Sequence, residues 1–413
     1  MKYVISGPSK SIQDTIYIPS SKSISNRILI IRALAGSRVQ MENISDSDDT
    51  KVLRKALVKG SSIKDIGHAG TTMRFLTAYF ATCPGEVILT GSHRMKQRPI
   101  GPLVTALRQL GAEVEYMEMD ECPPLKIRGG EIKGGSIEID GGISSQFISA
   151  LMMVGPVLEG GLRISLTGKV VSDTYLRMTI DLMRQCGVEA TFNGRQFYVP
   201  QQPYSIDSFK VEADWSGASY WYQIAAFLPG SQIELPNLAK VSLQGDAILT
   251  QLFQPLGVES NFSREGVTLH SMKREVPGIL VHDFTGCPDL VQTCVVTLCV
   301  MGVPFRFTGT KTLRVKETDR IAALQTELNK VGFRLDCDAE GEWISWDGSH
   351  CQATSDPVIQ TYHDHRMAMA FAPLAIPMGS ITIEDPMVVT KSYPAFWNDL
   401  KKAGFEIAEV QDS

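Results

Sequence analysis

Short polar segments rich in cations and hydroxyls recur along this 413-residue chain, each directly before an apolar stretch. Their members are Lys22, Ser23 and Arg27 in the first, Ser144, Ser145 and Gln146 in a later one, and His365 and Arg366 near the end. A helix that starts in such a segment offers unpaired N–H groups and a partial positive charge, which favour a bound anion. Helix capping by Ser explains any single segment, but the recurrence favours a binding site for small polyanions.

Two carboxylates stand among further cations and could transfer protons. In RVKETDRIAALQTEL, Glu317 is flanked by Lys316 and Arg320, and Asp289 lies in CPDLVQTC. The apolar spacing predicts a helix in which Lys316 and Arg320, four residues apart, share one side. A carboxylate among cations stays ionised unless burial opposes them, so both are candidate acids or bases. A solvated lattice of surface charges is the alternative.

Other chemistries find little support. The HxH arrangement of YHDHR suggests a metal site, but Arg366 would repel a divalent ion and no further ligand stands at a suitable spacing, so we expect no metal. The chain lacks a GxxxxGK[ST] loop, a GxGxxG motif after a strand and a GxSxG elbow. Nucleotide hydrolysis, dinucleotide redox chemistry and serine-hydrolase chemistry are therefore not indicated.

The composition excludes further classes of protein. The 40 Lys and Arg against 45 Asp and Glu give a net charge of −5, which argues against nucleic acid, and 43% hydrophobic residues exclude disorder. No apolar run reaches the about 18 residues of a membrane span, and MKYVISGPSKSIQ lacks an apolar signal region. Eight cysteines without a CxxC pair are typical of buried thiols, so we expect a cytoplasmic protein.

An amphipathic helix that ends at Gly and passes into a strand occurs six times. The glycines are Gly60, Gly111, Gly187, Gly257, Gly332 and Gly404. Glycine takes a positive φ after a helix without a steric penalty. A second phrase recurs at the same intervals, a polar turn and then a helix that is apolar nearly all round and should be buried. The first interval, 51 residues, is shorter than the others, which span 70 to 76.

These repeats predict an α/β fold of two similar domains, each built from three units around buried helices, with the first unit truncated. The segment 1–19 precedes the first buried helix and is predicted to pair with the last unit. The crossovers then fall near IPSSKS and FKVEADWSG. We therefore expect one domain over 20–211 and another over 212–413 together with 1–19, with the active site in the cleft between them.

The motifs SSKSISNR, AGTTMR, RMKQRPIG, SSQ, RVKETDR and DHRMAMA, in this order, resemble the 5-enolpyruvylshikimate-3-phosphate synthase family. The resemblance runs along nearly the whole chain. It implies two inside-out α/β domains, each of three βαβαββ units with helices inside. It also implies transfer of the enolpyruvyl group of phosphoenolpyruvate to the 5-hydroxyl of shikimate 3-phosphate, with release of phosphate, in chorismate and aromatic amino acid biosynthesis. A monomer without a cofactor is implied.

The resemblance implies a role for each matching position. Shikimate 3-phosphate would contact Ser23, Arg27, Ser144, Ser145, Gln146, Ser172, Tyr175, Asp289 and Lys316. Phosphoenolpyruvate would contact Lys22, Gly70, Arg98, Gln146, Arg320, Arg366 and Lys391. The catalytic residues would be Lys22, Asp289, Glu317 and His365. In the implied addition and elimination, Asp289 takes the hydroxyl proton, Glu317 protonates the methylene carbon, and Lys22 steadies the developing charge.

Three residues, His68, Phe75 and Thr312, depart from those usual in the family. With the short first unit, they leave open an impaired homologue that only binds anions, although such a protein needs neither Asp289 nor Glu317. A second alternative is the related transferase that acts on UDP-N-acetylglucosamine. It should carry a Lys-Asn pair near residue 22 and a loop Cys, whereas this chain has Lys-Ser and no Cys in SHRMKQRPIG.

Overall fold

The computed structural model describes residues 1–58, 60–168, 170–171, 173–273 and 278–410. Contacts within the chain divide it into two compact units. The N-terminal unit is Ser20–Val211, and the C-terminal unit is Glu212–Ser413 together with Met1–Pro19.

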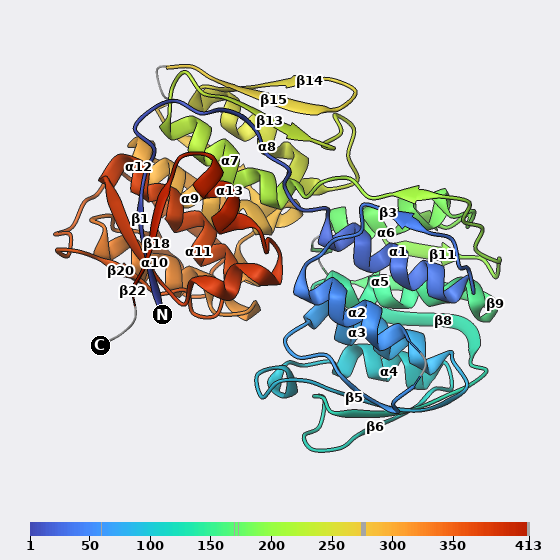
Figure 1. Cartoon of the computed structure of the whole chain (residues 1–413). Coiled ribbons are helices and arrows are strands. Elements are labelled where there is room, and N and C mark those ends of the chain that lie inside the picture. The colour runs from blue at the N-terminus through green and yellow to red at the C-terminus, as the bar shows by residue number, and fades with distance from the viewer. Residues whose placement is uncertain (59, 169, 172, 274–277, 411–413) are drawn as a thin grey trace. The chain divides into compact units, whose positions relative to one another are not determined.

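Three buried helices form the described interior of the N-terminal unit (Figure 1). They are α1 (Lys22–Leu34), α3 (Gly70–Ala81) and α5 (Ser145–Val154). The polar turns before α1 and α5 act as caps, since the hydroxyl of Ser21 accepts from the N–H of Ile24 and that of Ser144 accepts from the N–H of Gln146, whereas Ala69 before α3 provides no side-chain cap. Helices that are apolar on all sides are buried here, as the sequence predicts.

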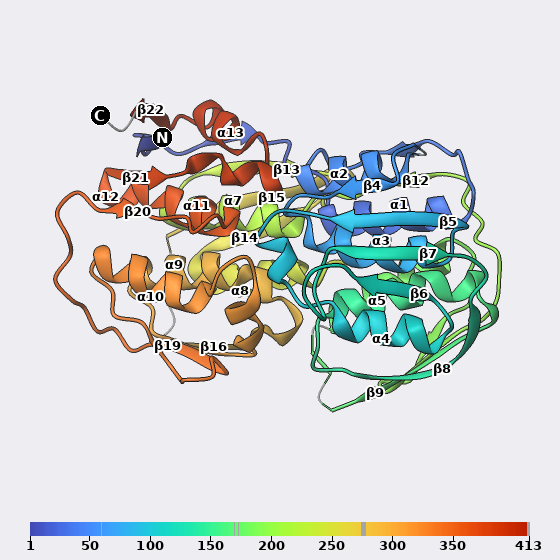
Figure 2. The ribbon, with the colours of Figure 1, turned by 90° about the horizontal axis from the view of Figure 1, so that it is seen from below.

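Amphipathic helices and two four-stranded sheets cover these helices (Figure 2). The covering helices are α2 (Asp48–Leu57), α4 (Gly101–Gln109) and α6 (Asp173–Gln185). One sheet has the order β4 (Ile63–Asp65), β5 (Gly85–Thr90), β7 (Leu125–Gly129), β6 (Glu113–Tyr116). The other has the order β10 (Thr191–Phe192), β11 (Gln196–Val199), β9 (Glu159–Thr167), β8 (Lys133–Asp140). Strands joined through a buried helix, β4 with β5 and β8 with β9, are parallel.

The C-terminal unit also contains three buried helices, each with an amphipathic outer helix. Its buried helices are α7 (Trp215–Phe227), α9 (Val291–Met301) and α11 (His365–Phe371), and its outer helices are α8 (Leu249–Phe253), α10 (Arg320–Lys330) and α13 (Phe396–Lys402). Helix α11 is short because Pro373 lacks the N–H that would continue it, and the chain goes on through a 3-10 turn to α12 (Ala375–Met378).

Three four-stranded sheets surround those helices. The first has the order β14 (Val258–Phe262), β15 (Gly266–Ser271), β13 (Gln232–Pro236), β2 (Gln13–Thr15). The second has the order β16 (Leu280–Asp283), β17 (Phe305–Thr308), β19 (Trp343–Trp346), β18 (Asp336–Cys337). The third has the order β20 (Val358–Ile359), β21 (Ser380–Glu384), β1 (Lys2–Ser6), β22 (Glu406–Val410). In Figure 1, strands β13, β14 and β15 lie over α7 and α8.

The segment before α1 supplies strands to two of these sheets. Strand β1 lies antiparallel between β21 and β22, which confirms the predicted pairing with the last unit. Strand β2 instead lies parallel to β13 in the fourth unit, so the prediction is wrong for that half of the segment. The reason is connectivity, since a strand that leads into a buried helix pairs in parallel with the strand that follows one.

The first unit is truncated, as the short interval predicts. Its sheet consists of β12 (Phe209–Lys210) and β3 (Met41–Glu42), which are parallel. Within the described part of the chain, α2 leads directly to β4, without the antiparallel pair that the other units carry.

Five of the six repeat glycines follow their helices with φ between 83° and 96°. Gly60 is the exception, because α2 ends at Leu57 and Val58 is already extended, so the predicted helix end at Gly60 is wrong. In the fourth copy, Pro255 replaces the last turn of α8 by a 3-10 turn before Gly257. The repeat therefore predicted the turn glycines better than the helix lengths.

Two global expectations concern membranes and thiols. None of the described helices is both long and apolar enough to cross a membrane. All eight cysteines lie in the described ranges, and none of them forms a disulfide there. Five are buried, as their apolar sequence context predicts, and Cys83, Cys337 and Cys351 are partly exposed.

Candidate active site

Arg320, the first residue of α10, is the centre of an ion-pair cluster in the C-terminal unit. Its side chain is almost fully buried, and its guanidinium lies 2.7 Å from Asp364 Oδ2, 3.1 Å from Asp289 Oδ1 and 3.1 Å from Glu317 Oε2. Burial acts to lower the pKa of Arg320, but the three carboxylates outweigh burial and raise it. One permanent cation therefore joins three chain segments.

Asp289 lies in the 3-10 turn Pro288–Leu290 that leads into α9. Its Oδ2 is 3.0 Å from Nη2 of Arg366, and its Oδ1 is 3.8 Å from Nζ of Lys316. Burial acts to raise the pKa of this carboxyl, but Arg366, Lys316 and Arg320 together lower it well below its usual range. Asp289 is therefore ionised at neutral pH and suited to accept a proton.

Glu317 stands between two cations from separate elements. Its Oε1 lies 2.7 Å from Nζ of Lys391, the last residue of the 3-10 turn Pro386–Lys391, and its Oε2 contacts Arg320. The side chain is mostly buried, as is that of Lys391. The two candidate proton-transfer groups thus bind different nitrogens of the Arg320 guanidinium, Asp289 at Nη1 and Glu317 at Nη2.

Lys316 reaches this cluster, but not in the predicted way. Helix α10 begins only at Arg320, because the carboxylate of Asp319 accepts hydrogen bonds from the N–H groups of Ile321 and Ala322 and caps the helix. Lys316 has an extended backbone after a 3-10 turn. The prediction that Lys316 and Arg320 share one helical side is therefore wrong, and Asp289 brings them together instead.

Helix α11 contributes His365 and Arg366 in its first turn. Asp364 caps this helix by accepting from the N–H of Arg366, and it also binds Arg320. Nδ1 of the buried His365 lies 3.6 Å from Oδ1 of Asp364. Asp364 is not among the predicted site residues, although its position directly before a predicted helix is a recognisable capping signal.

In the N-terminal unit, Lys22 is the first residue of α1, and its ammonium lies 3.4 Å from Oδ2 of Asp49. Asp49 is in the first turn of α2 and is buried, and its carbonyl accepts a hydrogen bond from Thr72 of α3. Asp49 therefore links the starts of three helices around Lys22. Asp49 does not stand out in the sequence, because SDSDD is also typical of an ordinary helix N-terminus.

Gly70 and Arg98 are in direct contact. A Cβ built on Gly70 would lie 2.5 Å from Nη1 of Arg98, so a larger residue would displace this guanidinium from its place beside the start of α3. On the other side of this start, Nε2 of Gln146 donates to Oγ1 of Thr71 at 3.1 Å. The predicted residues Gly70, Arg98 and Gln146 are thus gathered at neighbouring helix N-termini.

Arg27 is buried within the N-terminal unit and held by three hydrogen bonds. It donates to Oγ1 of Thr179 at 2.7 Å, to the carbonyl of Ser23 at 2.9 Å and to Oγ of Ser149 at 3.3 Å. The guanidinium also lies over the ring of Phe75, 5.3 Å from its centroid. Burial lowers the pKa of Arg27 to about 10, so it stays cationic at neutral pH.

The remaining predicted residues lie near these groups. Ser144 and Ser145 form the cap and first residue of α5, and the ring of Tyr175 lies 5.8 Å from the guanidinium carbon of Arg27. Ser172 lies outside the described residues. Of the three departures, Phe75 packs on Arg27 and Nδ1 of the exposed His68 is 2.9 Å from Oγ of Ser92, whereas the buried hydroxyl of Thr312 has no hydrogen-bond partner among the described residues.

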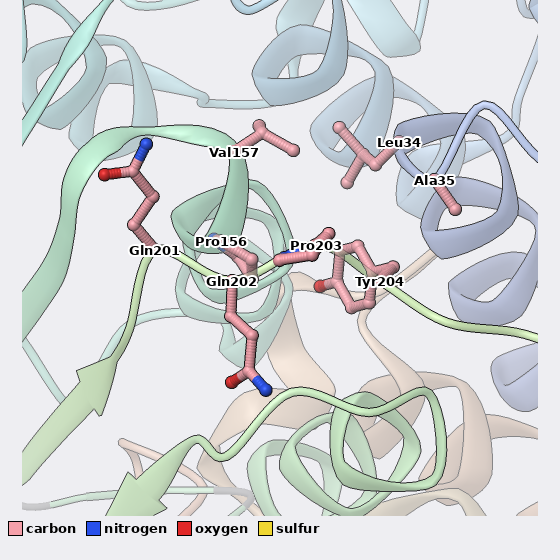
Figure 3. Close-up of a pocket in the computed structure, with 8 residues that line it drawn as sticks. All are labelled: Leu34, Ala35, Pro156, Val157, Gln201, Gln202, Pro203 and Tyr204. Atoms are coloured by element: carbon pink, nitrogen blue, oxygen red, sulfur yellow. The ribbon is translucent and has the colours of Figure 1, made fainter.

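A hollow of about 500 Å³ lies elsewhere in the N-terminal unit (Figure 3). It is lined by Leu34, Ala35, Pro156, Val157, Gln201, Gln202, Pro203 and Tyr204, none of which is a candidate site residue. The hydroxyl of Tyr204 donates to the carbonyl of Met153, and Gln202 bonds backbone groups on both sides of its amide. Among the described residues, no group of three or more His, Cys, Asp or Glu is arranged to hold a metal ion.

A sequence model of the family described as EPSP synthase (3-phosphoshikimate 1-carboxyvinyltransferase) matches residues 7–59 and 52–400. The chain belongs to this family. Relatives named 3-phosphoshikimate 1-carboxyvinyltransferase agree with this membership. One from Bacteroides fragilis is 50% identical over 98% of this chain and 99% of its own, and one from Vibrio atlanticus is 37% identical over 95% and 97%. The predicted resemblance and the prediction of an enzyme of the EPSP synthase family are confirmed.

The fold is also that of the EPSP synthase family. Two structures of EPSP synthase from Acinetobacter baumannii superpose on the chain with TM-scores of 0.76 and 0.78 at 20% identity. They cover 99% and 100% of this chain and all of the chains compared. The predicted α/β fold with buried helices is therefore confirmed.

Proposed function

We propose that this chain transfers the enolpyruvyl group of phosphoenolpyruvate to the 5-hydroxyl of shikimate 3-phosphate and releases phosphate. The observation that carries the proposal is the buried cluster in which Arg320, Arg366 and Lys391 surround Asp289 and Glu317. Two highly anionic substrates must be held together despite their repulsion, and fixed cations in a dry site supply that stabilisation.

The substrates divide over the residues of both units. Phosphoenolpyruvate uses Lys22, Gly70, Arg98, Gln146, Arg320, Arg366 and Lys391. Shikimate 3-phosphate uses Ser23, Arg27, Ser144, Ser145, Gln146, Ser172, Tyr175, Asp289 and Lys316.

In the addition step, the oxygen of the 5-hydroxyl bonds to the second carbon of phosphoenolpyruvate, and Asp289 accepts the proton that this hydroxyl loses. Glu317 gives a proton to the methylene carbon, which becomes a methyl group. Arg366, Lys316 and Arg320 lower the pKa of Asp289 and so keep its carboxylate ionised, as a proton acceptor must be, while the same cations make it a weaker base. Lys22 offsets the negative charge on the phosphate oxygens.

In the elimination step, the methyl group loses a proton and the bond from carbon to the phosphate oxygen breaks, which yields the enol ether and phosphate. Glu317 takes that proton back. The anionic groups of phosphoenolpyruvate compete for Arg320 and Lys391, the two cations that otherwise pair with Glu317. His365, in the first turn of α11, lies beside Asp364, the carboxylate that binds Arg320.

The test is phosphate release from phosphoenolpyruvate with shikimate 3-phosphate, and in parallel with UDP-N-acetylglucosamine. We expect release with shikimate 3-phosphate alone. Release with UDP-N-acetylglucosamine alone, or with neither acceptor, would refute the proposal. In the second case, binding of shikimate 3-phosphate without turnover would identify a protein that only binds anions. A monomeric state and a cytoplasmic location stay predictions.

A further inference from the structure

Glu327 is a buried carboxylate that the proposed mechanism does not use. It lies on α10 seven residues after Arg320, two turns along the same side of the helix, and its side chain has no exposed surface. Nζ of Lys330 contacts both of its oxygens, at 2.9 and 2.7 Å. Burial of a carboxylate is costly unless it is paired and hydrogen-bonded, so this position calls for a specific set of partners.

The other partners of Glu327 belong to the segment that leads into α11. The hydroxyl of Tyr362 donates to Oε1 at 2.6 Å, and the backbone N–H of Gln360 donates to Oε2 at 3.0 Å. Burial, with the hydrogen bond to Glu327, raises the pKa of Tyr362 to about 12, so the phenol remains a donor. Helix α10 is thereby fastened to the chain just before Asp364.

That segment has an unusual backbone. Tyr362 and His363 are consecutive residues with φ of 53° and 55°, the left-handed region that side chains with a Cβ rarely adopt. His363 is almost fully exposed, and Nδ1 of its ring lies 3.1 Å from Oδ2 of Asp385. Such a turn persists only when surrounding contacts stabilise it, and the hydrogen bond from Tyr362 to the buried Glu327 is one such contact.

The turn sets the start of α11. The N–H of Asp364 donates to the carbonyl of Thr361, after which Asp364 binds Arg320 and caps the helix at Arg366. If the turn relaxes toward right-handed backbone angles, Asp364 moves, so that the guanidinium of Arg320 loses one of its carboxylates and the backbone N–H of Arg366 loses its cap. The effect reaches the substrate-binding cations although Glu327 and Tyr362 belong to neither set of predicted substrate contacts.

We infer that Glu327, acting through Tyr362, is a positioning residue that fixes Arg320 and Arg366 for phosphoenolpyruvate. The role of these arginines rests on the proposed function. Tyr362→Phe removes only the hydroxyl that Glu327 holds. Because a net hydrogen bond is worth roughly a factor of two to ten in an equilibrium, we expect KM for phosphoenolpyruvate to rise about fivefold, with KM for shikimate 3-phosphate within about twofold of the parent.

A second-site change separates positioning from general stability. Gly takes positive φ without a Cβ penalty, so His363→Gly should hold the turn without Glu327 and return KM for phosphoenolpyruvate in the Tyr362→Phe background to within about twofold of the parent. Tyr222→Phe is the matched control, since it removes another hydroxyl hydrogen bond of the same unit, to Oγ of Ser260 at 2.7 Å. It should lower the thermal midpoint but leave both KM values unchanged.

The outcomes distinguish this inference from the proposed function. An inactive parent refutes the proposed function, and the affinity for inorganic phosphate then tests the positioning, with a severalfold loss expected in Tyr362→Phe. With an active parent, an unchanged KM for phosphoenolpyruvate in folded Tyr362→Phe overturns the inference. The inference is also overturned if KM for phosphoenolpyruvate rises equally in Tyr222→Phe, or if His363→Gly does not lower this KM in the Tyr362→Phe background.

Discussion

The ammonium of Lys391 lies 2.7 Å from Oε1 of Glu317, across 74 residues of sequence. Both side chains are mostly buried, and Glu317 also binds Arg320. The proposed acid of the reaction is thus held by two cations that the proposed function also assigns to the substrate. Binding and proton transfer are therefore coupled through the same contacts.

Glu317→Gln should lower kcat at least about 100-fold, the usual loss when a general acid is removed, with little change in either KM. The amide oxygen can still accept from one of the two cations, Lys391 or Arg320, but the NH2 group that replaces the other oxygen accepts no hydrogen bond, and the amide delivers no proton. Glu342→Gln is the control, since Glu342 forms a comparable contact with Lys311 at the surface, 2.9 Å long. A Glu317→Gln variant within about tenfold of the parent would contradict the assigned role.

Gly70→Ala should raise KM for phosphoenolpyruvate about tenfold, because the new methyl group would lie 2.5 Å from Nη1 of Arg98 and push the guanidinium aside. Steady-state kinetics with each substrate varied in turn measures this effect. Gly130→Ala, where a Cβ meets nothing within 4 Å, should leave the kinetics unchanged. Equal KM values for the two variants would show that Arg98 does not bind this substrate.

Arg27→Lys should raise KM for shikimate 3-phosphate about tenfold, since Lys cannot reproduce three hydrogen bonds to Thr179, Ser23 and Ser149. Saturating shikimate 3-phosphate raises the thermal midpoint of a protein that binds it. This rise should be smaller in the variant. Arg163→Lys, at an exposed strand position over Tyr198, serves as control, and an identical rise in the parent, in Arg27→Lys and in Arg163→Lys would argue against a role for Arg27.

The raised pKa of the buried Asp246 should make the stability of the protein depend on pH. Burial and repulsion by Asp289 raise its pKa to about 7, although Ser216 and Arg366 oppose the shift. An unfolded Asp releases its proton near pH 4, so between about pH 4 and 7 the native state binds more protons than the unfolded state. Raising the pH through this window therefore lowers stability.

Asp246→Asn stays neutral at every pH and should remove this loss. Its thermal midpoint relative to the parent should thus increase from pH 5 to pH 8. Glu409→Gln, which changes an exposed carboxylate of the same unit, is the control. A constant difference between Asp246→Asn and the parent across this range would refute the raised pKa.

The sequence by itself determined the elements whose signal is local. Six helices that are apolar on all sides had to be buried, and polar residues such as Lys22 and Arg366 stand in the first turns of these helices, where unpaired N–H groups favour anions. The positive φ of Gly111 and Gly332 follows from the same local rule.

The tertiary structure alone decided which groups pair. Strand β2 joined the fourth unit rather than the last, and Lys316 and Arg320 met through Asp289 because the cap at Asp319 starts α10 only at Arg320. Asp364 and Glu327 likewise acquired their roles from partners 33 to 44 residues away. Hydrophobic periodicity specifies a face and a helix end, but ion pairs depend on the distance between segments, which only the packed chain sets.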